Sequence, residues 1–368
     1  MKILSFQSCS LYENGGQSRV LRRLYKGHEN DVISVVVNYF PANSESGPIQ
    51  EKFIEVFPEI KSWMRWKVRN FVIWLRLHFF FYFTKRSIQN VVSKVECDVF
   101  HVIDQGMYSA SICESNLLKG KKLWVSFYDH FSLVSNSKNT KELWLKADRR
   151  LLISQELGDT YKKSFGNLEF ELITDGVSKE EISNPKSLNE TPTIYFAGLL
   201  HVDYYPLFSV LADALDSLAD DGYSFNLILR GTQQVGFLKD RKFNVEYRAN
   251  FVSDDEIKKE IDSADILYLP IKFTSPEFYL YSLSTKLISY LGGAGRILYH
   301  GPYDSAACNL LSSNNASVNC TTLLVSDMIN SVLNVLNDDC IVSRNAKKLA
   351  YDKFDFSKIQ NRFWELNY

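Results

Sequence analysis

Short runs of β-branched and other apolar residues alternate with stretches of helical periodicity along the whole chain. Such alternation is typical of parallel α/β folds, whose strands are buried on both faces. Six strands are predicted in the first half, at Lys2–Phe6, Val32–Val37, Val99–Ile103, Leu123–Phe127, Leu151–Ile153 and Glu171–Ile173. Helical patterns lie between them at Ser18–Tyr25, Ser109–Leu118 and Gln155–Ser164.

The pattern restarts after the polar segment Ser187–Pro192, which is predicted to be a linker. Strands follow at Thr193–Ala197, Phe225–Leu229, Val245–Tyr247, Ile266–Leu269 and Ile297–Tyr299. Helices are predicted at Pro206–Leu218, Asp254–Ser263, Thr285–Leu291, Asp327–Leu336 and Ser357–Leu366, the second of them behind a Ser253–Glu256 capping box. Because 368 residues exceed the usual size of one domain, we predict two α/β domains, 1–186 and 187–353. A C-terminal helix within 354–368 is expected to pack back toward the first domain.

Charge is divided unevenly between the two halves, although the net charge is only −1. Residues 1–150 hold 22 Lys and Arg against 14 Asp and Glu, a balance of +8, and the remainder carries −9. This asymmetry indicates that the N-terminal half faces an anionic partner, such as a phosphate-bearing ligand or a membrane surface. Nucleic acid is disfavoured because no nucleic-acid-binding motif accompanies the charge.

Compartment and metal content are inferred from the N-terminus and the cysteines. No apolar run long enough for a signal peptide opens the chain, which favours a cytoplasmic location. The six cysteines form no C-x-x-C pair and have no histidine at zinc-finger spacing. Free thiols in a reducing compartment and no bound metal are therefore expected.

The loop after the first strand contains paired glycines, Gly15 and Gly16, followed by Arg19. Glycines at the start of a helix allow backbone N–H groups to approach an anion closely, and a guanidinium adds a planar donor fork. We predict that this loop contacts a phosphate or the acceptor. The alternative is a simple loop with a solvated arginine. The loop lacks the G-x-G-x-x-G pattern, so no hydride-transferring dinucleotide is implied.

Several segments resemble the retaining GT-B glycosyltransferases of the family 4-like group, also called glycosyl transferase group 1. The opening strand with its Gly-Gly-x-x-Arg loop is one, and Ser284–Leu291 is similar to a Ser-Thr-Lys-Leu-Tyr-Glu-Tyr-Leu helix of a subset of these enzymes. Further similar segments are Cys97–Val102, Leu152–Leu157, Ile173–Val177 and Tyr195–Leu200. Their order and spacing extend from Met1 to about Leu366.

The resemblance implies two Rossmann-like domains that face each other across a cleft, with a UDP- or GDP-sugar as donor and no metal ion. It also implies that the donor diphosphate meets a helix N-terminus and basic side chains. The corresponding residues here are Ser282, Ser284, Thr285 and Lys286. The alternative is an ordinary helix N-cap beside a surface lysine.

This chain departs from the family on the donor side. Family members carry two glutamates eight positions apart, and the resemblance places Tyr281 and Ser289 there instead. Glu277 is the nearest carboxylate and is predicted to contact the donor sugar after a loop shift. The family's Arg and Lys after the first donor-domain strand are also absent, so Arg230 is predicted as a replacement cation.

On the acceptor side, Asp129 and His130 follow a predicted strand where the family has a similar pair. A carboxylate or an imidazole there can accept the proton of the acceptor hydroxyl or orient the donor sugar. His101 lies inside an apolar strand and is predicted to be a hydrogen-bonded core residue. Asp104, at the exit of the same strand, is a further candidate for the cleft.

The segment 61–86 combines seven basic residues with nine aromatic residues and contains no acidic residue. Such a composition suits an amphipathic helix at an anionic membrane surface, and its charges argue against a spanning helix. The alternative is that the aromatic face packs on the core of the N-terminal domain. We predict peripheral contact with the inner face of the cytoplasmic membrane.

Taken together, these features predict transfer of a sugar from a nucleotide sugar to a glycan or lipid-linked glycan in surface polysaccharide biosynthesis, with retention of configuration. Two alternatives stay open. One is a non-catalytic GT-B-like binding or scaffold protein, which the missing glutamates favour. The other is a sugar-nucleotide 2-epimerase, which typically needs several carboxylates and histidines in its cleft.

Overall fold

The computed structural model describes residues 1–38, 47–55, 66–134, 137–248 and 252–365. The chain divides into two compact units, Met1–Thr174 (unit 1) and Asp175–Tyr368 (unit 2). This boundary precedes the one expected after residue 186, because the first residues of unit 2 bond within it. The Val177 N–H donates to the Phe354 carbonyl at 2.7 Å, and the Ser183 N–H donates to the Gly292 carbonyl at 2.9 Å.

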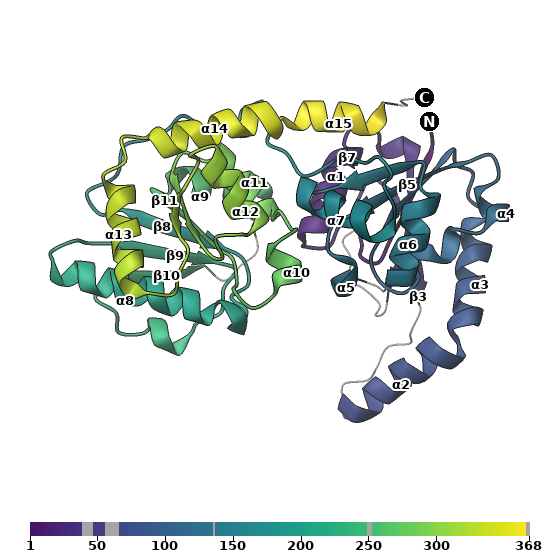
Figure 1. Ribbon diagram of the computed structural model, residues 1–368, viewed down its shortest axis with the longest axis horizontal. Coiled ribbons are helices and arrows are strands. Elements are labelled where there is room, and N and C mark those ends of the chain that lie inside the picture. The colour runs from purple at the N-terminus through teal and green to yellow at the C-terminus, as the bar shows by residue number, and fades with distance from the viewer. Residues whose placement is uncertain (39–46, 56–65, 135–136, 249–251, 366–368) are drawn as a thin grey trace. The chain divides into compact units, whose positions relative to one another are not determined.

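The described part of unit 1 contains a seven-stranded parallel sheet in the order β3-β2-β1-β4-β5-β6-β7 (Figure 1). Its strands are β1 Ile3–Gln7, β2 Val32–Asn38, β3 Gln50–Glu55, β4 Val99–Ile103, β5 Lys122–Phe127, β6 Arg149–Leu152 and β7 Glu171–Leu172. Its helices are α1 Gly16–Tyr25, α2 Trp66–Phe79, α3 Phe81–Val92, α4 Ser115–Leu118, α5 Phe131–Val134, α6 Ser137–Lys146 and α7 Gln155–Phe165.

Central strands of unit 1 agree with the apolar pattern, whereas elements at its margins do not. Every residue of β1 and β4 is buried, as expected for strands covered on both faces. All six predicted strands are confirmed, but the polar edge strand β3 was missed. The single helix predicted over Ser109–Leu118 is wrong. Extended backbone at Glu114 (ψ 138°) separates a short 3₁₀ turn from α4.

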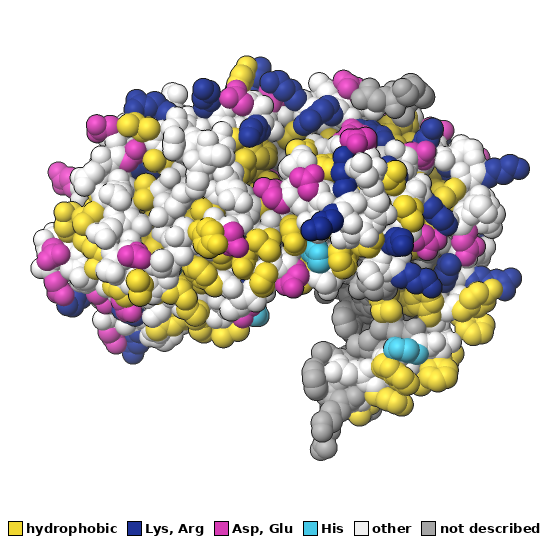
Figure 2. All heavy atoms as spheres, in the orientation of Figure 1, with side chains coloured by type: hydrophobic (Ala, Val, Ile, Leu, Met, Phe, Trp, Pro, Cys, Tyr) yellow, Lys and Arg dark blue, Asp and Glu magenta, His cyan; other side chains and the backbone are white. Residues whose placement is uncertain are grey.

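Helices α2 and α3, and the residue between them, expose large apolar side chains (Figure 2). These side chains are Phe71, Trp74, Phe79, Phe80, Tyr82 and Phe83. Helix α3 contacts the rest of unit 1 through a different set, since Ile88 and Val92 are fully buried and Phe81 stacks on Tyr108 at 5.0 Å between ring centroids. The alternative to membrane contact was that the aromatic face packs on the core. This does not hold for all of the described aromatic residues, since several are exposed.

The described part of unit 2 contains a six-stranded parallel sheet in the order β10-β9-β8-β11-β12-β13. Its strands are β8 Thr193–Ala197, β9 Asn226–Arg230, β10 Asn244–Arg248, β11 Ile266–Pro270, β12 Arg296–His300 and β13 Val318–Cys320. Its helices are α8 Tyr205–Asp220, α9 Asp254–Ser263, α10 Pro276–Tyr279, α11 Thr285–Gly292, α12 Ala306–Ser313, α13 Val325–Leu336, α14 Ile341–Lys353 and α15 Phe356–Trp364.

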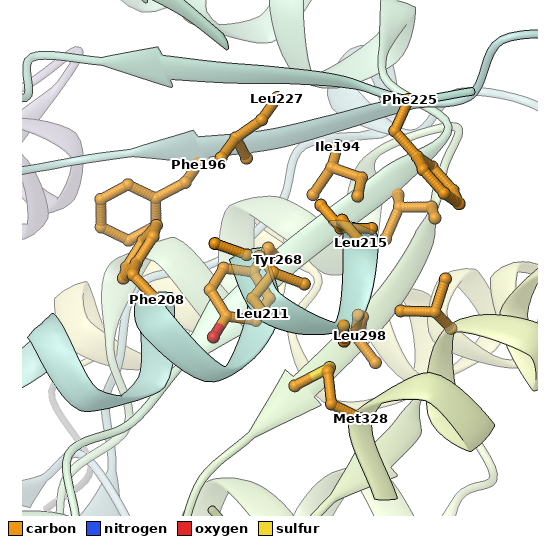
Figure 3. Close-up of a cluster of buried hydrophobic side chains, with 14 of the residues drawn as sticks. Ile194, Phe196, Phe208, Leu211, Leu215, Phe225, Leu227, Tyr268, Leu298 and Met328 are labelled. Atoms are coloured by element: carbon orange, nitrogen blue, oxygen red, sulfur yellow. The ribbon is translucent and has the colours of Figure 1, made fainter. Parts of the chain in front are cut away.

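Two apolar clusters form the core of unit 2. One joins β8, β9, β11 and β12 to helices α8 and α13, with Phe208, Leu211 and Met328 among its members (Figure 3). The other includes residues of α9, α11, α12 and α14, and Tyr195 and Leu269 are among its members. The sheet is therefore covered on both faces, which explains the apolar sequence of central strands such as β8 and β11.

The C-terminal helix α15 belongs to unit 2. Asp355 caps it by accepting the Ser357 N–H at 3.0 Å, and Val177 forms an isolated β-bridge with Asp355. The predicted packing of 354–368 toward the N-terminal unit stays a prediction. In each unit the strands run parallel, so their carboxyl ends gather at one edge, where α/β proteins bind ligands.

Candidate functional site

At the carboxyl edge of unit 2, the loop after β8 is held against the end of β9. The Gly198 N–H donates to the Arg230 carbonyl at 2.9 Å, and the Thr232 hydroxyl donates to the Gly198 carbonyl at 2.8 Å. Gly198 has φ +138°, a conformation that side-chain-bearing residues rarely adopt. Glycine is thus required at this position, where the backbone turns out of the sheet.

Helix α11 begins beside this edge with the predicted donor residues in its first turn. Ser284 is the N-cap, and its hydroxyl accepts the Leu287 N–H at 3.2 Å. Thr285 and Lys286 follow as the first helical residues. The unsatisfied N–H groups of a first turn and the positive end of the helix dipole favour anions at this place.

The Lys286 ammonium lies close to Gly198. Its Nζ is 3.2 Å from the point where a Cβ on Gly198 would stand and 3.7 Å from the centroid of the Phe196 ring. Burial lowers the pKa of Lys286 to about 7. Within the described ranges, Lys286 Nζ has no hydrogen-bond acceptor or carboxylate partner. A half-buried lysine whose ammonium lies over an aromatic face, with no acceptor among the described residues, suits an incoming anion.

Arg230, the predicted replacement cation, is engaged in a buried ion pair. Its Nε donates to Glu260 at 3.0 Å, and its NH2 group contacts the other carboxylate oxygen. Tyr195 and Arg248 donate to the same carboxylate at 2.7 and 2.8 Å. Burial by itself would raise the pKa of Glu260, but these hydrogen bonds outweigh it and lower the pKa to about 2. The Arg230–Glu260 pair therefore stabilises the ionised form of Glu260. Donor binding by Arg230 stays a prediction.

The remaining predicted donor residues lie on α10, α11 and the segment between these helices. Glu277 is exposed on α10, Tyr281 is half-buried, and Ser282 is buried. Ser289 donates its hydroxyl proton to the Thr285 carbonyl at 3.1 Å, one helical turn earlier. The structure thus brings Ser284, Thr285, Lys286 and Ser289 together on one helix, and it adds Phe196 and Gly198 to them. Phe196 and Gly198 were not predicted as site residues, because a single sequence does not show that Lys286 lies beside them; the glycine after the first strand of unit 2 is the one signal of a close approach.

In unit 1, the glycine loop lies at the carboxyl end of β1. Gly15 is the N-cap of α1, and its carbonyl accepts the Arg19 N–H at 3.0 Å. The space that a Cβ on Gly15 would take is open, and Gly15 and Gly16 are both exposed. Arg19 lies in the first turn of this helix, and the predicted contact of the loop with a phosphate or the acceptor stays a prediction.

The candidate acceptor residues follow β5 in the same unit. The Tyr161 hydroxyl donates to the Asp129 carbonyl at 2.9 Å, and His130 Nδ1 lies 2.8 Å from the Ser132 hydroxyl. Asp104 is buried and accepts hydrogen bonds from Ser109 and Thr140, at 2.9 and 2.7 Å. These hydrogen bonds hold Asp104 inside the unit rather than presenting it at the surface.

The prediction that His101 is a core residue is confirmed. Its ring is fully buried between the Tyr25 and Ser126 hydroxyls, at 2.6 and 2.8 Å. Burial lowers its pKa to about 3, so the imidazole is neutral at physiological pH. A neutral, enclosed histidine has no access to a substrate hydroxyl.

Across the described ranges, no group of three or more His, Cys, Asp or Glu side chains is placed to hold a metal ion. None of the described helices has both the length and the apolar composition needed to cross a bilayer.

Comparisons with known proteins define the fold. No protein-family model and no curated protein matches the sequence. Among solved structures, Anabaena Alr3699/HepE in complex with UDP and glucose has 13% identity and a TM-score of 0.67, covering 99% of this chain and 98% of that chain. A trehalose-phosphate synthase from Burkholderia vietnamiensis has 9% identity and a TM-score of 0.62 over 99% and 98%. The lipopolysaccharide outer core galactosyltransferase WaaB has 12% identity and a TM-score of 0.64 over 99% of both chains. The chain therefore has the α/β fold of the GT-B glycosyltransferases.

Proposed function

We propose that the protein is a glycosyltransferase that moves a sugar from a nucleotide sugar to a glycan or lipid-linked glycan in surface polysaccharide biosynthesis. The observation that carries the proposal is Lys286, whose ammonium lies beside Gly198 at the carboxyl edge of the unit 2 sheet without an anionic partner among the described residues. HepE, of the same fold, has been solved with UDP and glucose bound. In this proposal, the diphosphate of a nucleotide sugar is the anion that pairs with Lys286.

In this proposal, Lys286 and the first-turn N–H groups of α11 stabilise the diphosphate as it leaves the sugar, without a metal ion. Asp129 or His130 accepts the proton of the acceptor hydroxyl or orients the donor sugar. The glycine loop of unit 1 contacts the acceptor or a phosphate. Retention of configuration is part of the proposal and rests on the family resemblance.

A non-catalytic GT-B-like binding protein is the second candidate, and Tyr281 and Ser289 favour it. The family resemblance aligns them with the two glutamates of the related enzymes, so in this proposal the donor sugar and the ribose each lack a carboxylate acceptor. Release of free nucleoside diphosphate from a sugar nucleotide separates the two candidates. A protein that binds UDP-glucose but never cleaves it, with or without acceptor glycans, is the binding protein.

Binding of UDP-glucose is expected to weaken as the pH rises above 7. The pKa of Lys286 is lowered to about 7, so the ammonium loses its proton in this range unless the diphosphate holds it. Binding above pH 7 therefore takes up a proton, and the dissociation constant rises up to about tenfold per pH unit until the pKa of the bound state is reached. Calorimetry at pH 8 in two buffers of different ionisation enthalpy measures the uptake. Zero uptake, with affinity constant from pH 6.5 to 8.5, contradicts this role of Lys286.

We also propose that residues 61–86 contact the inner face of the cytoplasmic membrane, which gives access to a lipid-linked acceptor. Lys61 and Arg65 lie outside the described residues, but Arg86 is exposed, as are Phe79, Phe80 and Phe83. Aromatic side chains insert at the level of the lipid headgroups, while Lys and Arg are attracted to anionic lipid.

Vesicle flotation tests the membrane contact. The wild-type protein is expected to float with anionic vesicles at low salt and to be released at high salt, because charge contributes to the binding. Phe79→Asp with Phe83→Asp removes two exposed aromatic residues and is expected to abolish flotation. Ile341→Asp, at a comparably exposed position in unit 2, should float like wild type. A wild-type protein that stays with the unbound fraction at low salt refutes the contact.

A further inference from the structure

A row of polar side chains crosses the buried face of the unit 1 sheet that lies beneath α1. Parallel pairing places Ser5 of β1 opposite Ser34 of β2 and His101 of β4, and it places Ser34 opposite Glu51 of β3. Paired residues in neighbouring strands share a face, so these four side chains form one row. Ser5, Ser34 and His101 are fully buried, and nothing in the proposed chemistry uses them.

Hydrogen bonds connect the members of this row in sequence. The Tyr25 hydroxyl donates to Ser5 at 2.8 Å, Ser5 donates to the Gln7 side-chain carbonyl, and the Gln7 amide donates to Ser34 at 3.0 Å. Ser34 then donates to Glu51 Oε1 at 2.9 Å. Each group in this series donates to the next one, and the series ends at the Glu51 carboxylate.

The direction of the series also assigns the proton of His101. Tyr25 has a single hydroxyl proton, and this proton is given to Ser5. The 2.6 Å contact between Tyr25 and His101 Nδ1 therefore requires the proton to be on Nδ1. His101 Nε2 then accepts the Ser126 hydroxyl proton at 2.8 Å. The chain of hydrogen bonds thus runs from β5 to the edge strand β3.

At its far end, the Glu51 carboxylate holds the loop between β1 and α1. It accepts the Leu11 N–H at 2.9 Å and the Ser10 hydroxyl, in addition to Ser34. Ser10 is buried, and its carbonyl accepts the Ser18 hydroxyl of α1 at 2.6 Å. Three donors converge on one group, and an ionised carboxylate is the side chain that accepts all of them without presenting a donor.

We propose that Glu51 is a positioning residue. Its carboxylate orders the loop that carries Gly15 and Gly16, and it directs the buried hydrogen bonds so that neutral His101 carries its proton on Nδ1. The ordering of the loop follows from unit 1 alone. The effect on acceptor binding is the one part that rests on the proposed function. A loop that is already ordered loses less conformational entropy when a ligand binds, so the acceptor would bind more tightly.

The test uses Glu51→Gln in the full-length chain. A carboxamide turns one of the accepting atoms into a donor, so at least one of the Ser10, Leu11 and Ser34 donors loses its partner. Hydrogen exchange at the Leu11 and Arg19 amides is expected to become at least tenfold faster. In ¹⁵N-histidine spectra, the His101 signals of the wild type should be those of a neutral ring protonated on Nδ1. Glu96→Gln, at an exposed position of unit 1, is the matched control and should change neither readout.

Ser34→Ala separates the two parts of the proposal. It cuts the series between Gln7 and Glu51 but leaves the carboxylate bonded to the loop. The His101 signals are expected to shift while exchange at Leu11 stays within about twofold of wild type. Unchanged exchange at Leu11 and Arg19 in Glu51→Gln overturns the positioning role, and a wild-type His101 protonated on Nε2 overturns the direction of the series. Neither readout needs a substrate, so failure here is distinct from failure of the glycosyltransferase assignment.

Discussion

Lys286→Met is expected to weaken binding of UDP-glucose by about 10- to 100-fold. A hydrogen bond between charged partners contributes about 1.5–3 kcal/mol, and each 1.4 kcal/mol is a factor of ten in affinity. Methionine keeps much of the length and apolar contact of the side chain over Phe196. The loss therefore reports the charge, and titration calorimetry measures it.

The same substitution should leave unit 2 at least as stable as before. Burial without an anionic partner lowers the pKa of Lys286, so the charged side chain opposes folding at neutral pH. Lys348→Met, at an exposed position on α14, is the matched control for the loss of one positive charge. An unchanged dissociation constant in Lys286→Met would remove the proposed diphosphate site. A large fall in melting temperature would instead make Lys286 a structural residue.

Arg230→Met is expected to destabilise unit 2 by about 3 kcal/mol. Removing one member of a buried ion pair leaves the other charge in a poorly solvated place, and such changes cost about 3–5 kcal/mol. Arg248 and Tyr195 still donate to Glu260, so the lower value applies. For a unit of this size, the melting temperature should fall by roughly 6–12 °C. Arg344→Met, on the exposed surface of α14, should change it by less than about 2 °C.

Acid should remove the same stabilisation in the wild-type protein. The folded-state pKa of Glu260 is about 2, below its ordinary value of 4.5, so the contribution is complete above pH 4.5 and declines as the pH falls toward 2. Arg230→Met should show a smaller decline over this range. If Arg230→Met instead keeps the wild-type melting temperature and loses UDP-glucose binding, Arg230 is a donor contact, as the sequence predicted.

Strands of both sheets were largely predictable from the sequence, because central parallel strands are buried on both faces and read as apolar runs. Strand β3 was missed because five of its six residues are not aliphatic, and β13 because it has only three residues. The composition of residues 61–86 predicted an amphipathic helix there, but it did not predict the bounds of α2 and α3. Their exposed aromatic residues leave no clear polar face from which a helical period is read.

The candidate site was predictable where its residues are neighbours in sequence, as in the first turn of α11. Contacts between distant residues were not. The Lys286 side chain approaches Gly198 across 88 positions of sequence, and Glu260 is 30 positions from Arg230. A single sequence shows a charged residue but not its partner, so it does not reveal that Glu260 pairs with Arg230. The convergence of three donors on Glu51 is hidden for the same reason.

The most direct test of the glycosyltransferase assignment is release of free nucleoside diphosphate from a panel of UDP- and GDP-sugars, measured together with binding of each nucleotide. We expect at least one sugar nucleotide to bind and to be cleaved slowly without acceptor, with Lys286→Met reducing both binding and cleavage. A protein that binds no member of the panel at millimolar concentration and releases no diphosphate would contradict the assignment. It would favour a non-catalytic protein built on the same fold.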